Sequence, residues 1–280
     1  MTPTPVLELV RLEEDLPRLA DAYRRATPFP HVVLDDVLPA PVAARAAEEH
    51  AAVPDRAWRA YVHLNERKYA HNDPTAWGPS LRAVADQLNH PDFLGFLERL
   101  TGIEGLLPDP DLDGAGLHRI PRGGFLNVHA DFTAHHRDPG LRRRVNLLLF
   151  LNPGWDPAWG GALELWSRDM QRCGASIEPR ANRIVVFSTD ESAYHGHPEP
   201  LRCPPEVQRR SLALYYFTAE PSVDVRATTY RARPGDGVKG IGIYLDTKVL
   251  RAYDRLKRRL RLRDDVASRW SARLLRRRRH

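Results

Sequence analysis

Apolar residues recur at helical spacing in the first third of the chain, with short alternating stretches between them. This periodicity predicts helices over residues 1–27, 40–53, 80–89 and 92–102, and strands over 31–34 and 58–72. Ser80 is the expected N-cap of the third helix, and Gly102 is expected to end the fourth. This region is therefore predicted to mix helices with a few strands.

After residue 108 the pattern changes to short apolar segments separated by turns rich in glycine, proline and aspartate. These segments predict strands over residues 116–120, 125–131, 144–152, 162–167, 182–188 and 209–218. The sequence PRGG at 121–124 predicts a hairpin turn between the first two strands. Strands that follow one another without intervening helices indicate an all-β sandwich or barrel, jelly rolls included.

These patterns divide the chain into four parts. We expect an N-terminal helical and α+β region at 1–105 that packs on the core, and a strand-rich core at 106–220. A linker at 221–240 and a basic amphipathic C-terminal helix or tail at 241–280 follow. The predicted fold class is therefore α+β.

Composition narrows the class of protein further. Of the 280 residues, 42% are hydrophobic and 28% charged, which allows a sizeable core, and no apolar run is long enough for a membrane-spanning helix. The N-terminal residues lack the layout of a secretory signal. The two cysteines, Cys173 and Cys203, have no CxxC spacing, which fits a reducing compartment. A cytoplasmic location is therefore expected.

The formal charge of +6 is unevenly distributed along the chain. Residues 248–280 contain 14 basic and 3 acidic residues, whereas residues 1–247 contain 28 basic and 33 acidic ones. The mildly acidic body argues against nucleic acid as a partner of the whole protein. For the tail, three roles stay open: a packed helix with a solvated basic face, which the apolar stripe favours, a membrane-surface contact, and a nucleic-acid contact.

Four polar residues near strand ends have the spacing of a metal site. His129 and Asp131 are two residues apart in a predicted strand, so their side chains project from the same face. His195 and His197 form a second pair just after the strand at 182–188. Two histidines and one carboxylate on one face form the facial triad of non-haem Fe(II) oxygenases.

An arginine at the start of the last strand adds an anion-binding group. Arg209 shares its strand face with Ser211, and this face is smaller and more polar than the face that carries Arg210. An arginine that faces the inside of a barrel is costly unless it is paired. A dicarboxylate bound through two hydrogen bonds would pair it.

Several stretches of the core resemble the motifs of one known family. In order, they are NVHAD, RRVNLLLFLNPGW, GGALELW, IEPRANRIVVFSTD, HGHPEPL and RRSLALYYFT. They are similar to the motifs of the 2-oxoglutarate/Fe(II) dioxygenases of the prolyl 4-hydroxylase-like superfamily, above all those of bacterial members without an assigned substrate. The resemblance covers roughly residues 105–220.

The resemblance implies a double-stranded β-helix, or jelly-roll, core and a catalytic metal centre. By motif, His129, Asp131 and His195 would be the ligands of Fe(II), with His197 left as a supporting residue or a substitute for His195. Arg209 would bind the 5-carboxylate of 2-oxoglutarate. The implied cosubstrates are 2-oxoglutarate and O₂, and ascorbate is left open as a further cofactor.

The resemblance also indicates which residues line the pocket for the cosubstrate. Asn146, Leu148 and Phe150 share one strand face. Relatives often have a tyrosine in place of Phe150, which donates to the same carboxylate of 2-oxoglutarate. Because phenylalanine has no hydroxyl group, Ser211 or Asn146 is the expected second contact.

Other polar residues are interpreted without a role in catalysis. Arg142, Arg143 and Arg144 are expected to form a solvated charge run at the start of a strand. His135 and His136 are expected in a loop near the mouth of the site.

The sequence thus predicts a 2-oxoglutarate-dependent dioxygenase that hydroxylates an unactivated C–H bond. The substrate is a peptidyl residue, an amino acid, a sugar or a natural-product intermediate, and the co-products are succinate and CO₂. One alternative is a cupin-like metal-binding protein that uses His195 and His197 together. Another is a non-catalytic binding module with a basic tail.

Overall fold

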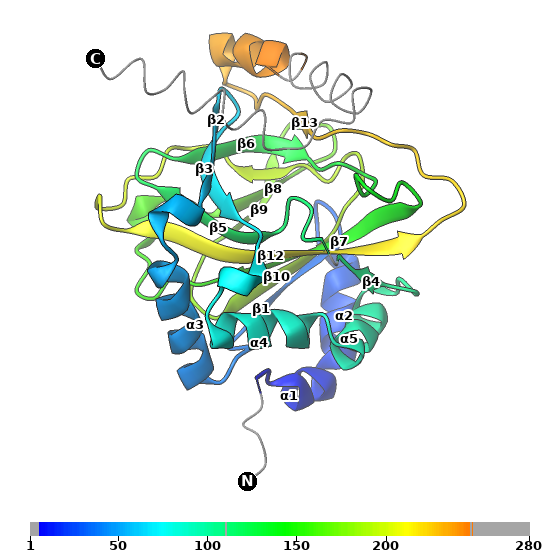
Figure 1. Ribbon diagram of the computed structural model, residues 1–280. Coiled ribbons are helices and arrows are strands. Elements are labelled where there is room, and N and C mark those ends of the chain that lie inside the picture. The colour runs from blue at the N-terminus through cyan, green and yellow to red at the C-terminus, as the bar shows by residue number, and fades with distance from the viewer. Residues whose placement is uncertain (1–5, 110, 247, 249–280) are drawn as a thin grey trace.

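The computed structural model describes residues 6–109, 111–246 and 248, in which most helices precede the main run of strands (Figure 1). The helices are α1 (Leu9–Glu14), α2 (Leu16–Arg25), α3 (Ala40–Ala52), α4 (Pro79–Leu88) and α5 (Pro91–Thr101). The strands are β1 (His31–Asp35), β2 (Arg59–His63), β3 (Glu66–His71), β4 (Leu107–Pro108), β5 (Gly116–Pro121), β6 (Phe125–Ala130), β7 (Leu141–Phe150), β8 (Leu163–Trp166), β9 (Cys173–Ile177), β10 (Arg183–Ser188), β11 (His195–His197), β12 (Gln208–Ala219) and β13 (Thr229–Tyr230). Residues 237–246 are also helical.

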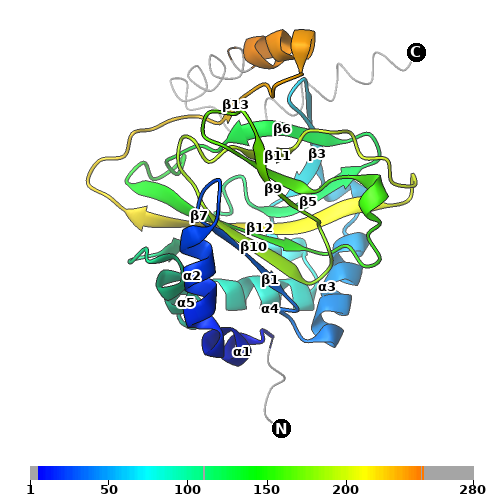
Figure 2. The same ribbon diagram turned by 180° about the vertical axis from the view of Figure 1, so that it is seen from behind.

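The strands form one antiparallel sheet that curls over on itself (Figures 1 and 2). Its order is β1-β10-β7-β12-β5-β3-β6-β11-β8-β9, with β13 beside β6, β2 beside β3 and β4 beside β12. The first five strands of this order make one layer, the last four make the facing layer, and β3 joins the two (Figure 2). The predicted α+β class with a curled β core is confirmed.

The helices cover the outer face of the layer that contains β7, β10 and β12 (Figures 1 and 2). Val145, Leu147 and Leu149 alternate along β7 and are buried in one cluster with Phe93 and Phe96 of α5. Burial of apolar faces from a helix and a sheet against each other is the main contribution to the stability of such a layer. The other face of β7 therefore lines the inside of the curled sheet.

Apolar side chains from the two layers meet on this inner side. Phe150 of β7 and Phe187 of β10 cluster with Leu163 and Leu165 of β8. All four side chains are almost completely buried. Polar residues of the candidate site contact this apolar interior, since the His195 ring lies against the Phe187 ring.

The strand predicted at 58–72 is wrong, because the segment is the hairpin of β2 and β3. Its turn contains Leu64 and Asn65 and lacks the glycine or proline that marks most tight turns. The Asn65 side chain is buried and donates to the Asp246 carboxylate over 2.6 Å. A contact with the C-terminal helical segment thus stabilises the turn, and local sequence gives no sign of it.

Two smaller expectations about turns and caps are also wrong. Gly124 donates to the Pro121 carbonyl as a turn requires, but β5 and β6 are not paired, because β3 lies between them. Ser80 lies inside α4, and the Glu49 carboxylate of α3 accepts from the backbone N–H groups of Ser80 and Leu81. This tertiary contact replaces the side-chain cap.

The remaining helical expectations hold with adjusted bounds. Gly102 ends α5 in the left-handed conformation, with φ of 71°. The helix predicted over 1–27 is divided into α1 and α2 at Asp15, and Pro17 in the first turn of α2 has no backbone N–H to continue α1.

The C-terminal part contains more regular structure than a linker. Within 221–240, β13 pairs with β6, and helical residues begin at 237. Of the basic helix predicted over 241–280, residues 241–246 and 248 lie within the described part of the chain and are helical. The rest of that prediction lies outside the described residues. No helix in the described residues is both long and apolar enough to cross a membrane.

Candidate metal and cosubstrate site

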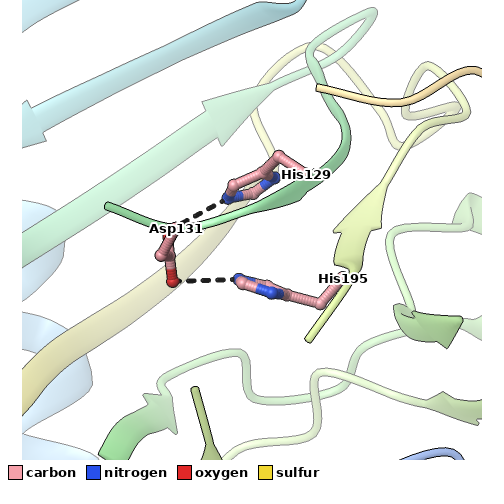
Figure 3. A group of neighbouring side chains, drawn as sticks. All are labelled: His129, Asp131 and His195. Carbon is pink, nitrogen blue, oxygen red and sulfur yellow. Dashed lines mark ion pairs between the residues drawn. The ribbon is translucent and has the colours of Figure 1, made fainter. Parts of the chain in front are cut away.

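Three side chains bring metal-binding atoms together beside β6 and β11 (Figure 3). His195 of β11 lies opposite His129 of β6, and Asp131 directly follows β6. Nε2 of His129 is 3.4 Å from one carboxylate oxygen of Asp131, and Nε2 of His195 is 3.5 Å from the other. One ligand atom from each residue lies within 4.8 Å of the others, which suits coordination of a single ion.

The two histidines are held in the tautomer that a metal requires. Nδ1 of His129 lies 2.9 Å from the Asn127 carbonyl oxygen, and Nδ1 of His195 lies 2.9 Å from the Ala193 carbonyl oxygen. In a neutral ring each Nδ1–H donates to its carbonyl, so the lone pair is on Nε2 and faces Asp131. The donor set therefore fits an ion bound by two imidazoles and a carboxylate.

The protonation states fit the same ion. Burial lowers the pKa of His195 to about 4, so the ring is neutral near pH 7. Burial alone would raise the pKa of Asp131, but the positive charge of Arg143 holds it well below its usual value. A neutral imidazole and an ionised carboxylate are the forms that bind metal without releasing a proton.

Arg143 is buried against this carboxylate. The expectation that Arg142, Arg143 and Arg144 form a solvated run of charges is therefore wrong for Arg143. The Arg143 side chain is 1% exposed, and its Nη2 donates to Oδ2 of Asp131 over 2.8 Å. Its guanidinium lies between the rings of Phe132 and Tyr215, with centroid distances of 4.6 and 3.4 Å. Arg143 is thus a buried partner of a candidate metal ligand.

A β-bulge turns Arg143 inward. Along β7 and β12, Val145 pairs with Tyr216 but Arg143 pairs with Phe217, so Arg144 has no opposite residue. A bulge reverses the inward and outward alternation beyond it. Arg142 and Arg144 remain at the surface and pair with Glu220. Counting along the strand without the bulge predicts the wrong face for Arg143.

Asn146 also contacts the carboxylate of Asp131. Its amide nitrogen donates to Oδ2 of Asp131 over 2.7 Å, and its oxygen accepts from Nε of Arg143 over 2.8 Å. Asn146 is therefore placed against the candidate metal ligand. Ser211 is buried on β12, opposite Phe150 on one side and His118 on the other.

Arg209 is a buried cation without a carboxylate partner among the described residues. It is 5% exposed, its Nε donates to the Gly161 carbonyl over 2.7 Å, and its guanidinium lies 4.9 Å from the centroid of the Phe150 ring. Burial lowers the pKa of Arg209 to about 9. A buried, unpaired guanidinium is costly, so the site is suited to an anionic ligand.

His197 is adjacent in sequence to the metal-binding atoms but is not part of the triangle. It lies on β11 opposite Leu126 of β6, and the register shifts between His195 and His197. It is 3% exposed, and neither ring nitrogen has a hydrogen-bond partner among the described residues. The cupin-like alternative would use His195 and His197 together, whereas the donor atoms that converge are those of His195, His129 and Asp131.

Sequence reasoning did not find Tyr230, which borders the metal-binding atoms. Tyr230 of β13 pairs with His129, and the centroids of their rings are 5.4 Å apart. It is 8% exposed, so the strand after the jelly-roll core helps to shield this imidazole from water. A tyrosine in a segment with many loop-forming residues gave no signal of this contact.

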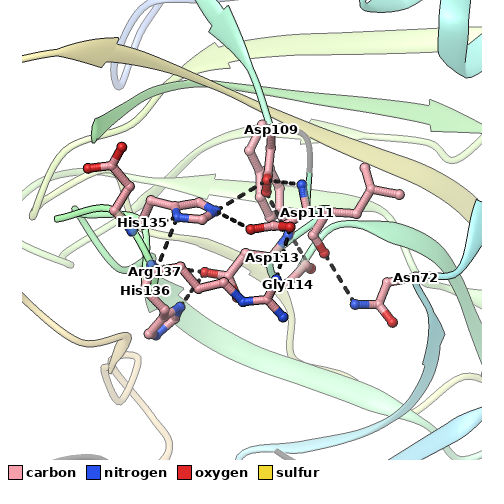
Figure 4. A network of polar contacts seen from close by, with 11 residues as sticks. Asn72, Asp109, Asp111, Asp113, Gly114, His135, His136 and Arg137 are labelled. Atoms are coloured by element: carbon pink, nitrogen blue, oxygen red, sulfur yellow. Dashed lines mark hydrogen bonds and ion pairs between the residues drawn. The ribbon is translucent and has the colours of Figure 1, made fainter. Parts of the chain in front are cut away.

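His135 and His136 take part in a separate polar network (Figure 4). Nε2 of buried His135 lies 3.3 Å from a carboxylate oxygen of Asp109, and Nδ1 of His136 contacts the Asp113 carboxylate. Asp109 also accepts from the backbone N–H of Asp113. These contacts fasten the loop after β6 to the segment before β5.

Comparisons with known proteins indicate what the strand-rich core is similar to. Residues 115–217 match the model of the 2OG-Fe(II) oxygenase superfamily. Over 147 residues, 51% of this chain, the sequence is 28% identical to mouse prolyl 3-hydroxylase OGFOD1. The match spans 24% of the length of that relative, about a quarter of it.

Two solved structures show the same fold. A Trichoplax adhaerens prolyl hydroxylase in complex with a hypoxia inducible factor peptide is similar with a TM-score of 0.54, at 15% identity over 77% of this chain and 94% of that one. A prolyl 4-hydroxylase from Phytophthora capsici is similar with a TM-score of 0.51, at 20% identity over 80% of this chain and 70% of that one. At these identities the likeness concerns the fold, and the predicted jelly-roll core is confirmed.

Proposed function

From the match of residues 115–217 to the 2OG-Fe(II) oxygenase superfamily, we propose that this protein is a 2-oxoglutarate-dependent hydroxylase. The observation that carries the proposal is the triangle of His129, Asp131 and His195. Both imidazoles in it present Nε2 to the shared carboxylate. Arg209 supports the proposal, because it has no carboxylate partner in the part of the chain that the structure describes, and an anion would compensate its buried charge.

Each group of the site has a role in this reaction. His129, Asp131 and His195 would hold iron(II), and Arg209 would bind the 5-carboxylate of 2-oxoglutarate through a charge-assisted hydrogen bond. Bound iron(II), with 2-oxoglutarate and O₂, supplies the oxidation of a substrate C–H bond, with succinate and CO₂ as co-products. Arg143 and Asn146 would fix the orientation of the Asp131 carboxylate.

The apolar interior excludes water from the reaction. Phe150, Leu163 and Phe187 are buried together in one apolar cluster on the inner side of the sheet. The ring of Phe187 lies 4.8 Å from the ring of His195. A dry pocket strengthens the electrostatic contacts made by Arg209 and limits side reactions of the oxidant.

A prolyl residue in a peptide is the first substrate to test. The mouse relative is named as a prolyl 3-hydroxylase, and the structure from Trichoplax adhaerens contains a peptide fragment. Free amino acids, sugars and natural-product intermediates are the other substrate classes we propose, since fold similarity does not transfer specificity.

Turnover of 2-oxoglutarate without substrate tests the proposed activity. With Fe(II), O₂ and ascorbate present, we expect slow formation of succinate. His195→Ala should abolish it, whereas His136→Ala should preserve it, because His136 contacts Asp113 outside the triangle. Wild-type protein that binds iron but forms no succinate, alone or with peptides and metabolites, would contradict the proposal.

A further inference from the structure

His197 is a buried polar side chain whose hydrogen-bonding capacity is unused. It is 3% exposed, and within residues 6–109, 111–246 and 248 neither Nδ1 nor Nε2 has a hydrogen-bond partner. An imidazole carries at least one N–H donor in every protonation state. Leaving such a donor buried without an acceptor is costly, so a ligand is the natural acceptor.

The charged neighbours of His197 indicate what kind of ligand this is. Arg209 and Lys68 are both within electrostatic reach of the ring. Lys68 is already compensated by the Glu66 carboxylate, 3.0 Å away. Arg209 has no such partner in the described residues, and its Nε is occupied by the Gly161 carbonyl, so the rest of the guanidinium is available. One buried positive charge within electrostatic reach of an unused N–H donor suits a single carboxylate.

His197 lies at a different position along β6 from the metal-binding atoms. His195 lies opposite His129, whereas His197 lies opposite Leu126. Two residues of an extended strand span about 6.6 Å. A five-carbon dicarboxylate that meets the metal at one end can therefore place its far carboxylate near His197.

A glycine maintains this spacing between the two histidines. A Cβ atom on Gly196 would lie 2.8 Å from the Leu126 carbonyl oxygen and 3.0 Å from that of Asn127. Glycine thus lets β11 pack directly against the backbone of β6 at the register shift. This contact fixes the positions of His195 and His197 along β6.

The other groups around Arg209 supply few donors to a carboxylate. The ring that lies against its guanidinium is Phe150, which has no donor atom. Ser211 offers one hydroxyl from the same face of β12. Asn146 is engaged with Asp131 and Arg143, so its amide is already used. Among the described residues, His197 adds a second donor that is buried and unused.

Resting on the proposed function, we propose that His197 donates a hydrogen bond to the 5-carboxylate of 2-oxoglutarate beside Arg209. In this role His197 binds the cosubstrate and does not coordinate the metal. It would complete the recognition of a dicarboxylate, so that 2-oxoacids without the distal carboxylate gain nothing from it.

Binding measurements without O₂ test this assignment. The metal is Co(II) or Fe(II), and the two probes are 2-oxoglutarate and 2-oxobutyrate, which shares the 2-oxoacid group but lacks the distal carboxylate. His197→Phe removes the donor and retains a ring, and His197→Gln retains an amide donor. His197→Leu serves if phenylalanine disturbs folding, which thermal denaturation would reveal.

We expect His197→Phe to weaken 2-oxoglutarate binding by about ten- to a hundredfold. Its metal affinity and its affinity for 2-oxobutyrate should match the wild type, and His197→Gln should recover part of the loss. Unchanged 2-oxoglutarate affinity, an equal loss for both 2-oxoacids, or a loss of metal affinity would each overturn the assignment. Wild-type protein that binds metal but neither 2-oxoacid would instead refute the proposed function.

Discussion

At the scale of single residues, the support of Asp131 distinguishes this site from a chance cluster of polar groups. Oδ2 of Asp131 accepts from both Arg143 and Asn146, and Arg143 is nearly inaccessible to solvent. Buried ionised groups persist when their charges are paired and their hydrogen bonds are made. The pair places the carboxylate in the orientation in which both imidazoles face it.

Replacing Arg143 should weaken metal binding, while the rest of the fold stays intact. Arg143→Met keeps much of the side-chain volume but removes the donors to Asp131, so we expect Co(II) affinity to fall by about ten- to a hundredfold. Titration of metal-free protein with Co(II), followed by absorbance, measures this.

Arg142→Met is the matched control, because Arg142 lies at the surface and pairs with Glu220. It should bind Co(II) as the wild type does. Equal affinities of the Arg143→Met variant and this control would show that Arg143 has no influence on the site.

The sequence could predict the residues of the site only where local pattern carries the information. His129 and Asp131 were predicted from their spacing in a strand, and the face of Arg209 from alternation along β12. Arg143 was missed, since the bulge at Arg144 reverses the alternation and nothing in the run of arginines marks it. Bulges depend on the partner strand, which a single sequence does not display.

At the scale of secondary-structure elements, β11 is the element on which the site depends most. It has three residues, lies between β6 and β8, and carries both His195 and His197. Long strands such as β7 and β12 were predictable from their apolar runs. The strand β11 was not, because HGH is too short and has too little β-propensity to be recognised.

Gly196→Ala should disturb this element. Its Cβ would contact carbonyl oxygens of β6 at 2.8 and 3.0 Å, and a backbone shift is the only relief. We expect a loss of about 1–3 kcal/mol in the free energy of unfolding, together with weaker metal binding. Urea denaturation and Co(II) titration measure the two effects.

Gly95→Ala provides the comparison for this substitution. Gly95 lies inside α5, and the nearest atom to its Cβ would be the flexible end of Arg99 at 3.5 Å. Alanine there should leave stability unchanged or raise it by about 0.5–1 kcal/mol. If the Gly196→Ala variant were as stable as the Gly95→Ala variant and bound Co(II) with the same affinity, the close packing of β11 on β6 would be refuted.

A buried histidine of α3 makes stability depend on pH. Burial, with a contribution from Arg210, lowers the pKa of His50 to about 3, and its Nε2 lies 3.1 Å from the His118 carbonyl oxygen. The unfolded chain takes up a proton on this histidine near pH 6.5, well before the folded state does. The free energy of unfolding should therefore fall as pH decreases from about 6.5 toward 3.

Urea denaturation at several pH values checks this expectation. One histidine contributes a slope of up to about 1.4 kcal/mol per pH unit in that range. His50→Gln keeps a donor for the carbonyl but cannot titrate, so its slope should be shallower than that of the wild type. Identical slopes would mean that His50 does not contribute.

At the scale of the whole molecule, the excess basic residues lie outside the part of the chain that forms the candidate site. The candidate site is enclosed by residues 29–230, and this part of the chain belongs to the mildly acidic body. The basic residues in excess are in 248–280. Of the roles left open for these residues, the one tested here is contact with an anionic surface such as a membrane, and we propose that they take no part in the chemistry.

Deletion of residues 248–280 should remove binding to anionic surfaces and leave the activity intact. The shortened chain has 28 basic and 33 acidic residues, so its retention on anionic vesicles at low salt should disappear. Succinate formation should persist, because the residues of the site remain. Retention that survives the deletion would place the anion-binding surface on the body.

The central claim is that one site binds both Fe(II) and 2-oxoglutarate, and anaerobic absorption spectroscopy tests it most directly. Addition of Fe(II) and then 2-oxoglutarate to the whole protein should produce a visible metal-to-ligand charge-transfer band. The band should be absent in His129→Ala and weaker in Arg209→Ala, which keeps the metal ligands but loses the cation for the far carboxylate. Wild-type protein that has bound iron and shows no band with saturating 2-oxoglutarate would contradict the account.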